Sequence, residues 1–535
     1  MPLTPTPRWL FALAVLVPVL RAAEPGSPSK VLAKEGEPAP GKTPGRTGLV
    51  GVGTDGRLRY QPYTSRGDTL PDFSHCGYAG GDRAIPDAVV RETLSPKAGE
   101  GDDSPRIQDA LDRVAALPPG ADGLRGAVLL QRGTYTCNAP LHLRASGVVL
   151  RGEGDGEAGT VLTAAFRKAG PLVLVGGAES PKEDARSRVE ITDDYVPVGA
   201  TNLNVADAAG YAVGQTVFVT RRGNAAWIHT IGMDRIQPRA SDPHSTKQWT
   251  PFDLKFDRVI TAIDGHRVTV DAPIACAIDQ QWGGGALGRC MGPDRIEHCG
   301  VESLRGISIY DAKKTARYQG ETVFVDEDHA TYLVQFNHVK NAWARNLTTL
   351  HFYHGPAYVN DTAKWITVQD CRALAPVSVI TGGRRYPYCV LGQLVLVQRC
   401  FSSEARHAFV FGARVAGPNV FFDCRSEHDY ATSEPHHRWS VGGLYDNVDA
   451  HLAIQDRQWM GSGHGWAGAN YVVWNSQGEL VCQQPPTAQN FAIGFTGQRT
   501  KGAFERPDGW WESTGTRVEP GSLFLAQRRD RLGHD

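Results

Sequence analysis

The densest group of ionisable side chains lies between Ser403 and Arg438, in the runs SEARHAFVFGAR and DCRSEHDYATSEPHHRW. Guanidinium groups pair with carboxylates in a bidentate way, and imidazole rings exchange protons near neutral pH. Together they suit removal of a proton beside a carboxylate, with Arg neutralising that carboxylate and His acting as the base. A solvated charged surface is the alternative interpretation. The candidate catalytic residues are Arg406, His407, Glu434, His436, His437 and Arg438.

Aromatic and further basic residues lie near this segment and at other predicted turns. Sugar rings have apolar C–H faces that stack on aromatic side chains, so tryptophan beside a polar loop suits a saccharide ligand. The phrase GSGHGWAGAN at 461–470 indicates backbone held close to a ligand or to a neighbouring coil. Burial in the interior is the alternative for the tryptophans. The candidate substrate-binding residues are His354, Arg385, Arg414, Trp439, Asp446, His464 and Trp466.

The carboxylates of the region suit a different reaction. Inverting hydrolysis of a glycosidic bond needs two carboxyl groups roughly 6.5–9.5 Å apart, one protonated and one activating water. A zinc site is disfavoured, because neighbouring side chains on a strand point to opposite faces and His436 and His437 then cannot bind one ion together. Carboxyl pairs are available from Asp423, Glu427, Asp429, Glu434 and Asp446.

A repeated β-rich phrase must position these residues. From about residue 340, short apolar runs end in Asn or Cys at spacings of 25, 29, 24, 23 and 28 residues. Such lengths fit solenoid coils with loops of varying size, stacked roughly 4.8 Å apart. We expect Asn and Cys to share one internal column, with amides bonded between coils and thiols as small buried apolar groups. Unrelated strands of a β-sandwich are the alternative. The phrases end at Asn346, Cys371, Cys400, Cys424, Asn447 and Asn475.

A helix and several short strands precede the repeats. Apolar residues from Ile107 to Leu117 keep helical spacing, with Asp or Ser available as the N-cap. The runs GAVLLQRGTY at 126–135 and SGVVLRGEG at 146–154 are β-rich and punctuated by Gly. We expect the helix to cap the open end of the solenoid, which would otherwise pair with other chains.

This part of the sequence resembles the pectate-lyase-like superfamily. The run DDS at 102–104, the helical residues after it and the two β-rich runs are similar to the N-terminal cap and first coils of that superfamily, over about 60 residues. The resemblance implies an all-β fold, a right-handed parallel β-helix with an N-terminal capping helix. It also implies carbohydrate cleavage as a class, without choosing the reaction, because one fold hosts several chemistries.

The resemblance also bears on cofactors and on the reaction. Related lyases often hold calcium on acidic side chains to neutralise the substrate carboxylate, a role open to Asp423, Glu427 and Asp429. Calcium is therefore an optional cofactor, and no other is implied. Related hydrolases carry Gly-His-Gly, present here at 463–465, but their preceding carboxylate motifs are missing, so their catalytic residues do not carry over.

We expect an enzyme that cleaves an acidic, uronate-containing polysaccharide by β-elimination. The excess of Arg and His at 406–438 favours elimination over the alternative, an inverting glycoside hydrolase of the polygalacturonase or rhamnogalacturonase type. A noncatalytic polysaccharide-binding solenoid is the third interpretation, since the fold does not guarantee chemistry.

Residues 189–275 interrupt the solenoid rhythm. They contain alternating strands, and Asp264-Gly265 between two of them is a strong hairpin signal. We expect a small antiparallel β insertion within residues 189–294. Its linking stretch at 223–253 is a long loop that closes over a cleft or pads the solenoid.

Composition and the first residues bear on location and partners. A formal net charge of −1 over 535 residues excludes a polybasic nucleic-acid binder, and ten cysteines are too few for a disulfide scaffold. Arg8 precedes twelve apolar residues, a pattern typical of a secretory signal and too short to span a membrane. We expect a secreted or periplasmic protein with a polysaccharide partner, no nucleic acid and no stable membrane insertion; the sequence does not give the oligomeric state. The expected segments are a signal peptide at 1–23, a flexible leader at 24–46, a cap and first coils at 47–188, the insertion at 189–294, the main β-helix at 295–485 and a C-terminal cap at 486–535.

Overall fold

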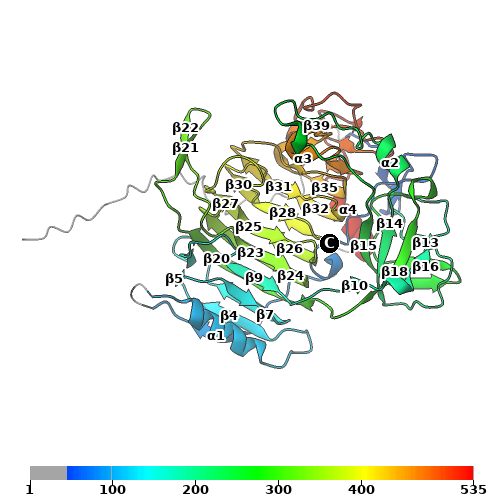
Figure 1. Cartoon of the computed structure of the whole chain (residues 1–535). Coiled ribbons are helices and arrows are strands. Elements are labelled where there is room, and N and C mark those ends of the chain that lie inside the picture. Colours follow the sequence, from blue (N-terminus) through cyan, green and yellow to red (C-terminus); the bar gives the residue numbers. More distant parts are fainter. Residues whose placement is uncertain (1–44, 98, 100, 534–535) are drawn as a thin grey trace, which may run out of the picture. The chain divides into compact units, whose positions relative to one another are not determined.

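The computed structural model describes residues 45–97, 99 and 101–533. The predicted signal peptide and nearly all of the predicted leader lie outside these residues. The described chain forms a right-handed parallel β-helix, as predicted, in which strands of each coil pair in parallel with the coils before and after it (Figure 1). No helix among the described residues is long and apolar enough to cross a membrane.

The coils contribute strands to three parallel sheets, of which the first two are continuous through β20 and β24 and the third ends at β34. The first sheet contains β3 (Val90–Leu94), β4 (Gly126–Leu130), β7 (Val148–Gly152), β19 (Ile296–Glu297), the first parts of β20 (Gly300–Ser308) and β24 (Val339–Leu350), β26 (Lys364–Gln369), β29 (Leu396–Gln398), β32 (Ala416–Phe422), β35 (Ser440–Asp446), β37 (Gly468–Ala469), β38 (Val472–Trp474), β40 (Phe491–Ile493) and β42 (Trp510–Glu512). The second contains β5 (Gly133–Cys137), β8 (Thr160–Ala164), the last parts of β20 and β24, β27 (Arg372–Leu374), β30 (Phe401–Ser403), β33 (Arg425–Glu427), β36 (Asp449–Ile454), β39 (Gln477–Cys482) and β41 (Gln498–Arg499). The third contains β6 (Leu141–Leu143), β9 (Val173–Gly176), β23 (Tyr332–Asn337), β25 (Gly355–Val359), β28 (Tyr388–Val390), β31 (Phe409–Phe411) and β34 (Glu434–Pro435).

A residue in the left-handed backbone conformation turns the chain from the first sheet into the second in coil after coil. The φ angles at these corners lie between 47° and 58°, a region that short polar side chains tolerate better than most. The strand registers align the corners in one column. The corner residues are Ser303, Asn346, Asp370, Arg399, Asp423, Asn447 and Asn475.

The three cysteines of the repeat occupy the neighbouring column, one residue later. Cys371, Cys400 and Cys424 are buried in the core and carry free thiols. Burial raises the pKa of the Cys371 and Cys424 thiols well above the ordinary value, so they remain protonated. The predicted apolar role of the thiols is consistent with this burial.

The predicted single Asn and Cys column is therefore wrong by one residue, because the corner favours a left-handed residue and the next side chain points into the core. The predicted bonds between stacked amides are also absent at Asn475. Its Nδ2 atom donates to the Val518 carbonyl, 2.8 Å away, rather than to an amide of the next coil.

Helix α1 (Ser104–Ala115) covers the first coil, as the resemblance implied. Ile107, Ala110, Leu111 and Val114 are buried on one face and pack into the core beneath it, whereas Leu117 lies outside the helix and is exposed. The carboxylate of Asp103 does not cap the helix; it accepts hydrogen bonds from the Thr136 amide and the Arg106 side chain. The cap thus fixes the first turn to the coil it covers.

The insertion leaves the solenoid after β9 and returns at β19, so it begins before the predicted residue 189. Its strands pair antiparallel, as predicted, and the hairpin β15–β16 turns through Gly265 and His266, one residue later than predicted. The elements are β10 (Lys182–Glu183), η2 (Ala185–Ser187), β11 (Val189–Glu190), β12 (Tyr195–Val196), β13 (Asn202–Asn204), β14 (Thr216–Arg221), α2 (Ala225–Thr230), η3 (Pro243–Ser245), β15 (Leu254–Asp264), β16 (Arg267–Val270), β17 (Ile278–Asp279), η4 (Gln280–Trp282) and β18 (Gly285–Met291).

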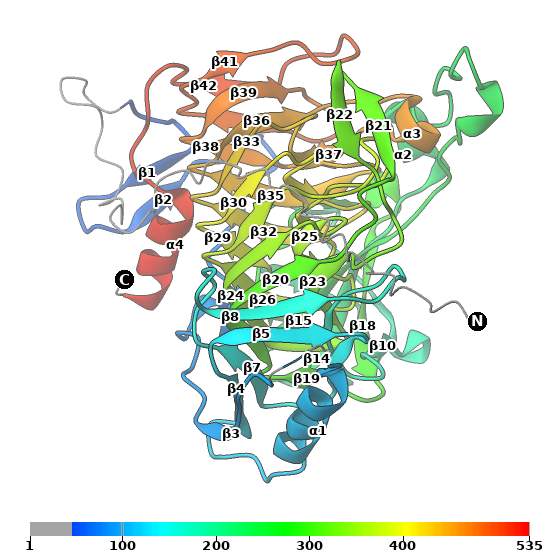
Figure 2. The same ribbon diagram turned by 90° about the vertical axis from the view of Figure 1, so that its left-hand side faces the viewer.

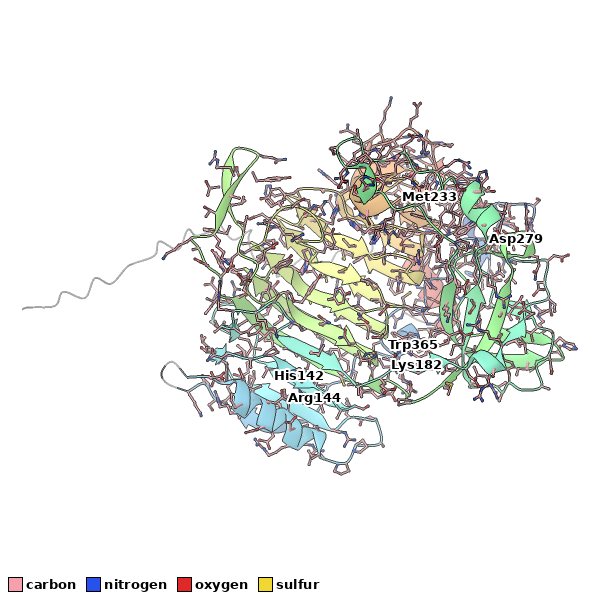
Figure 3. The ribbon with its side chains drawn as sticks, in the orientation of Figure 1. His142, Arg144, Lys182, Met233, Asp279 and Trp365 are labelled. Atoms are coloured by element: carbon pink, nitrogen blue, oxygen red, sulfur yellow. The ribbon has the colours of Figure 1, made fainter. Side chains whose placement is uncertain are left out.

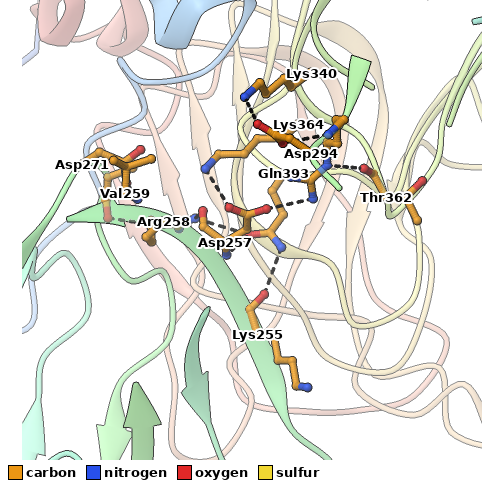
Figure 4. Close-up of polar contacts among 12 residues, drawn as sticks. Lys255, Asp257, Arg258, Val259, Asp271, Asp294, Lys340, Thr362, Lys364 and Gln393 are labelled. Atoms are coloured by element: carbon orange, nitrogen blue, oxygen red, sulfur yellow. Dashed lines mark hydrogen bonds and ion pairs between the residues drawn. The ribbon is translucent and has the colours of Figure 1, made fainter. Parts of the chain in front are cut away.

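A buried ionic group joins the insertion to the solenoid (Figure 4). Asp257 of β15 receives Lys364 Nζ of β26 at 2.9 Å and Arg295 Nη2 at 2.8 Å. Burial alone would raise the pKa of Asp257, but the two cations hold it below its usual value. The charge of Asp257 is therefore retained at the interface between the two parts of the fold.

The segment 45–90, here called the N-terminal strap, runs along the first sheet from the last coils to the first (Figure 2). It includes β1 (Val50–Val52), β2 (Leu58–Tyr60) and η1 (Tyr78–Gly81). Gly45 donates to the Arg517 carbonyl at 2.8 Å, Gly77 donates to the Leu394 carbonyl at 2.9 Å, and the Tyr78 ring meets Trp343 edge-on at 5.4 Å. Residues 47–89 thus cover the outside of the solenoid instead of building its first coils.

Helix α4 (Leu523–Leu532) lies against the strap and not at the end of the solenoid. Gln527 Oε1 accepts from the Phe73 amide at 2.9 Å, and its Nε2 donates to Tyr60 Oη at 3.0 Å. One further hairpin, β21 (Thr315–Tyr318) and β22 (Glu321–Phe324), projects from the coil that leads into the third sheet (Figure 1).

Candidate active site

The six predicted catalytic residues lie together on the outer side of the third sheet. Residues two apart on a strand point to the same side, so Glu434 of β34 and His436 after it face one way. His407 precedes β31, the neighbouring strand, and comes beside them. Glu434 and His407 are only 1% and 2% exposed, so this group is built into the protein.

Arg457, which the sequence analysis missed, holds the carboxylate of Glu434. Its Nη1 atom lies 2.5 Å from Glu434 Oε1 and 2.8 Å from the carbonyl oxygen of His436. The same Oε1 atom lies 3.0 Å from His436 Nδ1 and 3.4 Å from His407 Nδ1. Thr432 Oγ1 donates to the other carboxylate oxygen at 3.0 Å. Glu434 is thus a fully bonded carboxylate between two imidazole rings.

Tyr386, also missed, links this group to Arg406. The Tyr386 Oη atom lies 3.3 Å from His436 Nε2 and 3.0 Å from Arg406 Nη1. Its ring contacts the His407 and His436 rings at centroid distances of 5.1 and 5.3 Å. The coil register could have indicated Tyr386, because Tyr386 and His407 occupy the same position in adjacent coils.

His437, Arg438 and His464 form the more open side of the site. The His437 and His464 rings stack at 4.6 Å, and His464 also meets His436 at 5.0 Å. All three residues are half-buried. Arg438 adopts a left-handed φ of 59°, and its Nη2 atom donates to Ser462 Oγ at 2.9 Å. The tight turn at 438 fixes the guanidinium beside the paired rings.

Burial keeps the histidines neutral. It lowers the pKa of His407 to about 3, and, together with the nearby Arg438 charge, that of His437 to about 4. The pKa values of His436 and His464 also fall well below the ordinary value, first through burial and then through the charge of Arg457. At physiological pH these rings therefore have free lone pairs.

The loop 223–253 of the insertion borders this open side. Trp249 Nε1 donates to the Gly463 carbonyl at 3.0 Å, and Lys247 N donates to the Ser462 carbonyl at 3.1 Å. Met233 lies near α3 (Met460–Gly463) in Figure 3, and a Cβ on Gly465 would meet its sulfur at 2.3 Å. Gly463 and Gly465 thus let the backbone approach the insertion, a partner that the prediction of a ligand or a neighbouring coil did not include.

The remaining predicted basic residues occupy different positions. Arg414 is exposed, lies over the Phe252 ring at 4.1 Å, and its charge contributes to the lowered pKa of His437. His354 stacks on Tyr332 at 4.4 Å, and its Nδ1 accepts from the Tyr386 amide at 3.2 Å. Arg385 is 2% exposed and donates to the Ser378 carbonyl, behind the site.

Three predicted substrate-binding residues have no surface to offer a saccharide. Trp439 and Trp466 are buried in the core of the insertion, where Trp439 meets Trp227 at 5.1 Å and Trp466 donates to the Ile231 carbonyl. Asp446 accepts from Ser522 Oγ at 2.6 Å and holds the start of α4, away from the histidines. These placements correct the prediction, because packing and not ligand contact accounts for all three.

The three acidic residues predicted for calcium do not come together in one group. Among the described residues, the one group of three ligand-type side chains with donor atoms within 4.8 Å of one another is His407, Glu434 and His436, and it does not include Asp423, Glu427 or Asp429. Asp423 is a corner residue, Glu427 pairs with Arg425, and Asp429 accepts from Ser426. In the histidine group the Arg457 guanidinium already occupies the position beside Glu434 that a cation would need.

Comparisons with known proteins show distant similarity. The sequence matches no family model and no curated protein. Among solved structures, the Gp54 tailspike of Acinetobacter baumannii bacteriophage AP22, in complex with capsular saccharide, matches at 9% identity and a TM-score of 0.40, covering 78% of this chain and 55% of that one. An alginate lyase from Paenibacillus matches at 9% identity and 0.38, covering 80% and 99%, and the Streptococcus pneumoniae surface adhesin PfbA at 11% and 0.36, covering 79% and 81%. The chain thus spans little more than half of the first tailspike, and these similarities are too low to bear on its activity.

Proposed function

We propose that this protein is an exported enzyme that cleaves an acidic polysaccharide by β-elimination at the histidine site. The observation that carries the proposal is a set of buried nitrogen atoms without a partner. They surround a site that contains the guanidinium groups of Arg406, Arg414, Arg438 and Arg457. Among the described residues of this site, the one carboxylate is that of Glu434. The unpaired atoms are His407 Nε2, His437 Nδ1, Arg438 Nε, Arg457 Nε and His464 Nδ1.

Unpaired buried polar atoms favour a ligand that satisfies them. Each costs about 1–3 kcal/mol when desolvated without a partner. An excess of positive charge selects an anionic ligand, and guanidinium groups pair with carboxylates in two parallel hydrogen bonds. Arg406 and Arg438 are both half-buried, so a ligand carboxylate can reach them. A uronate unit of a polysaccharide has the required charge.

The same groups suit elimination. Pairing with Arg makes the proton next to the uronate carboxylate more acidic, and a neutral imidazole then accepts it. Inverting hydrolysis is less well supported, because it requires two available carboxyl groups. Glu434 is already bonded to Arg457. The group of Glu434 with His407 and His436 includes no second carboxyl group, since it contains none of Asp423, Glu427, Asp429 and Asp446.

A panel of uronate polymers tests the proposal. Purified protein is incubated with polygalacturonate, alginate, chondroitin and hyaluronan, with and without added calcium. Elimination leaves an unsaturated sugar, so ultraviolet absorbance should rise with at least one polymer. New reducing ends without absorbance would show hydrolysis instead, and neither signal, with saccharide binding retained, would show a binding solenoid.

Variants locate the activity. His437→Ala and Arg438→Ala should each abolish turnover while the thermal midpoint stays near that of the wild type. His451→Ala, an exposed histidine on the second sheet, is the matched control and should keep the wild-type rate. Wild-type turnover in both site variants would contradict the assignment of this site.

A further inference from the structure

Tyr386 lies where a proton donor to a leaving group would be needed. It is 7% exposed. Its hydroxyl donates to the Gly382 carbonyl at 3.0 Å, accepts from Arg406 Nη1 at 3.0 Å and lies 3.3 Å from His436 Nε2. The bond from its amide to His354 Nδ1 fixes the backbone behind it. The phenol is therefore held between a cation and an imidazole.

Glu434 and Arg457 hold the Nδ1 side of the His436 ring. Arg457 Nη1 lies 2.5 Å from Glu434 Oε1, 2.8 Å from the His436 carbonyl and 2.9 Å from His436 Nδ1. His436 Nδ1 lies 3.0 Å from Glu434 Oε1. The opposite ring nitrogen, Nε2, faces Tyr386 Oη at 3.3 Å.

We propose that His436 is the general base and Tyr386 the general acid of the elimination, with Glu434 and Arg457 as positioning residues for the imidazole. This inference rests on the proposed function and deepens it, since it assigns the two proton transfers to two specific atoms.

The proton and electron balance closes within the pair. His436 Nε2 takes the proton from C5 of the uronate, and the C–H electron pair becomes the C4–C5 double bond. The C4–O bond breaks, and the leaving oxygen takes the proton of the Tyr386 hydroxyl. His436 then returns its proton to the Tyr386 oxygen across the 3.3 Å contact, which restores both groups. Arg406 stabilises the phenolate that exists between these two transfers.

The protonation states at rest agree with these roles. Burial and the Arg457 charge lower the pKa of His436, so the base is neutral at physiological pH. Burial raises the pKa of Tyr386, so the acid is protonated. Two neighbouring groups whose pKa values are driven apart in this way are suited to act as a base and an acid.

The test separates the two roles by the leaving group. Wild type, Tyr386→Phe and His436→Ala are assayed on the uronate polymer and on a uronic acid that carries a 4-nitrophenyl ether at C4. The nitrophenolate leaves without protonation. Tyr386→Phe should lose about 10²–10⁴-fold in rate on the polymer and less than tenfold on the ether. His436→Ala should lose its rate on both substrates.

Tyr358→Phe is the matched control, because Tyr358 lies on the same outer side of the sheet without contacting His436, and it should keep both rates. Wild-type turnover of the polymer by Tyr386→Phe, or equal losses on the two substrates, would overturn the acid role while leaving the elimination intact. A wild-type protein that forms no unsaturated product would instead overturn the proposed function, and this inference with it.

Discussion

Arg457 Nη1 lies 2.5 Å from Glu434 Oε1, inside the group formed by Glu434, His407 and His436. Two imidazoles and a carboxylate are a familiar ligand set for zinc. Here the guanidinium takes the place of the ion and neutralises the carboxylate.

Arg457→Ala should therefore create a zinc site. The variant leaves Glu434 buried without its cation, which costs about 3–5 kcal/mol, so its thermal midpoint should fall. Added Zn²⁺ should bind with a stoichiometry of one, measured by calorimetry, and restore part of the midpoint. Wild type should bind no zinc at this site. Zinc binding by wild type, or by Arg457→Ala combined with Glu434→Ala, would contradict this interpretation.

The neutral histidines predict a pH dependence of stability. The pKa of His407 is about 3 in the folded protein, against an ordinary value of 6.5. Between these values the unfolded state binds more protons, so the free energy of unfolding falls as the pH drops from about 6.5 towards 3. The slope for one such group reaches about 1.4 kcal/mol per pH unit.

His407→Asn should flatten that slope when chemical denaturation is measured at several pH values. Asp429 and Asp446 act in the opposite direction, because their folded pKa values are raised to about 7 and stability from them is lost as the pH rises through that range. The comparison is therefore between wild type and variant at each pH. Parallel pH profiles would show that His407 is not buried neutral.

Gly465→Ala should separate the insertion loop from the site. The residue has a φ of 56°, and an added Cβ would lie 2.3 Å from Met233 Sδ and 2.7 Å from the Trp249 ring. Crowding of this kind costs about 1–3 kcal/mol. Limited proteolysis should cut the loop 223–253 faster in the variant. Gly210→Ala, in open space on the same insertion, should behave as wild type.

Asp257→Ala should loosen the insertion as a whole. It leaves Lys364 and Arg295 buried without their counter-ion, a change that costs about 3–5 kcal/mol. A lower thermal midpoint and faster proteolysis within 178–294 are expected. Asp264→Ala, at the exposed hairpin turn, removes a carboxylate from the same strand and should change neither measurement.

The sequence was sufficient for the fold because solenoid coils repeat. The β-rich phrases and the helix from Ser104 predicted both the stacking and the cap. The prediction that Asn and Cys share one column was wrong, because a corner requires a left-handed φ, which residue type determines only in part. Asp370 and Arg399 fill the same position as Asn346 without resembling it.

The site was predicted in part for the same reason. Glu434 and His436 share a face through their spacing, and both were named as candidates. Arg457 and Tyr386 reach them from other coils, so no local pattern marks them. Trp439 and Asp446 looked available because a single sequence does not show that the insertion and helix α4 cover them.

The N-terminal strap changes how such a molecule comes apart. A solenoid without a strap can unfold from either end, because each coil contacts only the coils next to it. The N-terminal strap contacts Arg517, Leu394 and Trp343 in turn and so joins distant coils. If the last coil unfolds, the strap is released and earlier coils lose their cover. Unfolding should then be a single all-or-none event. During synthesis, the strap cannot pack fully until the last coils of the solenoid have been made.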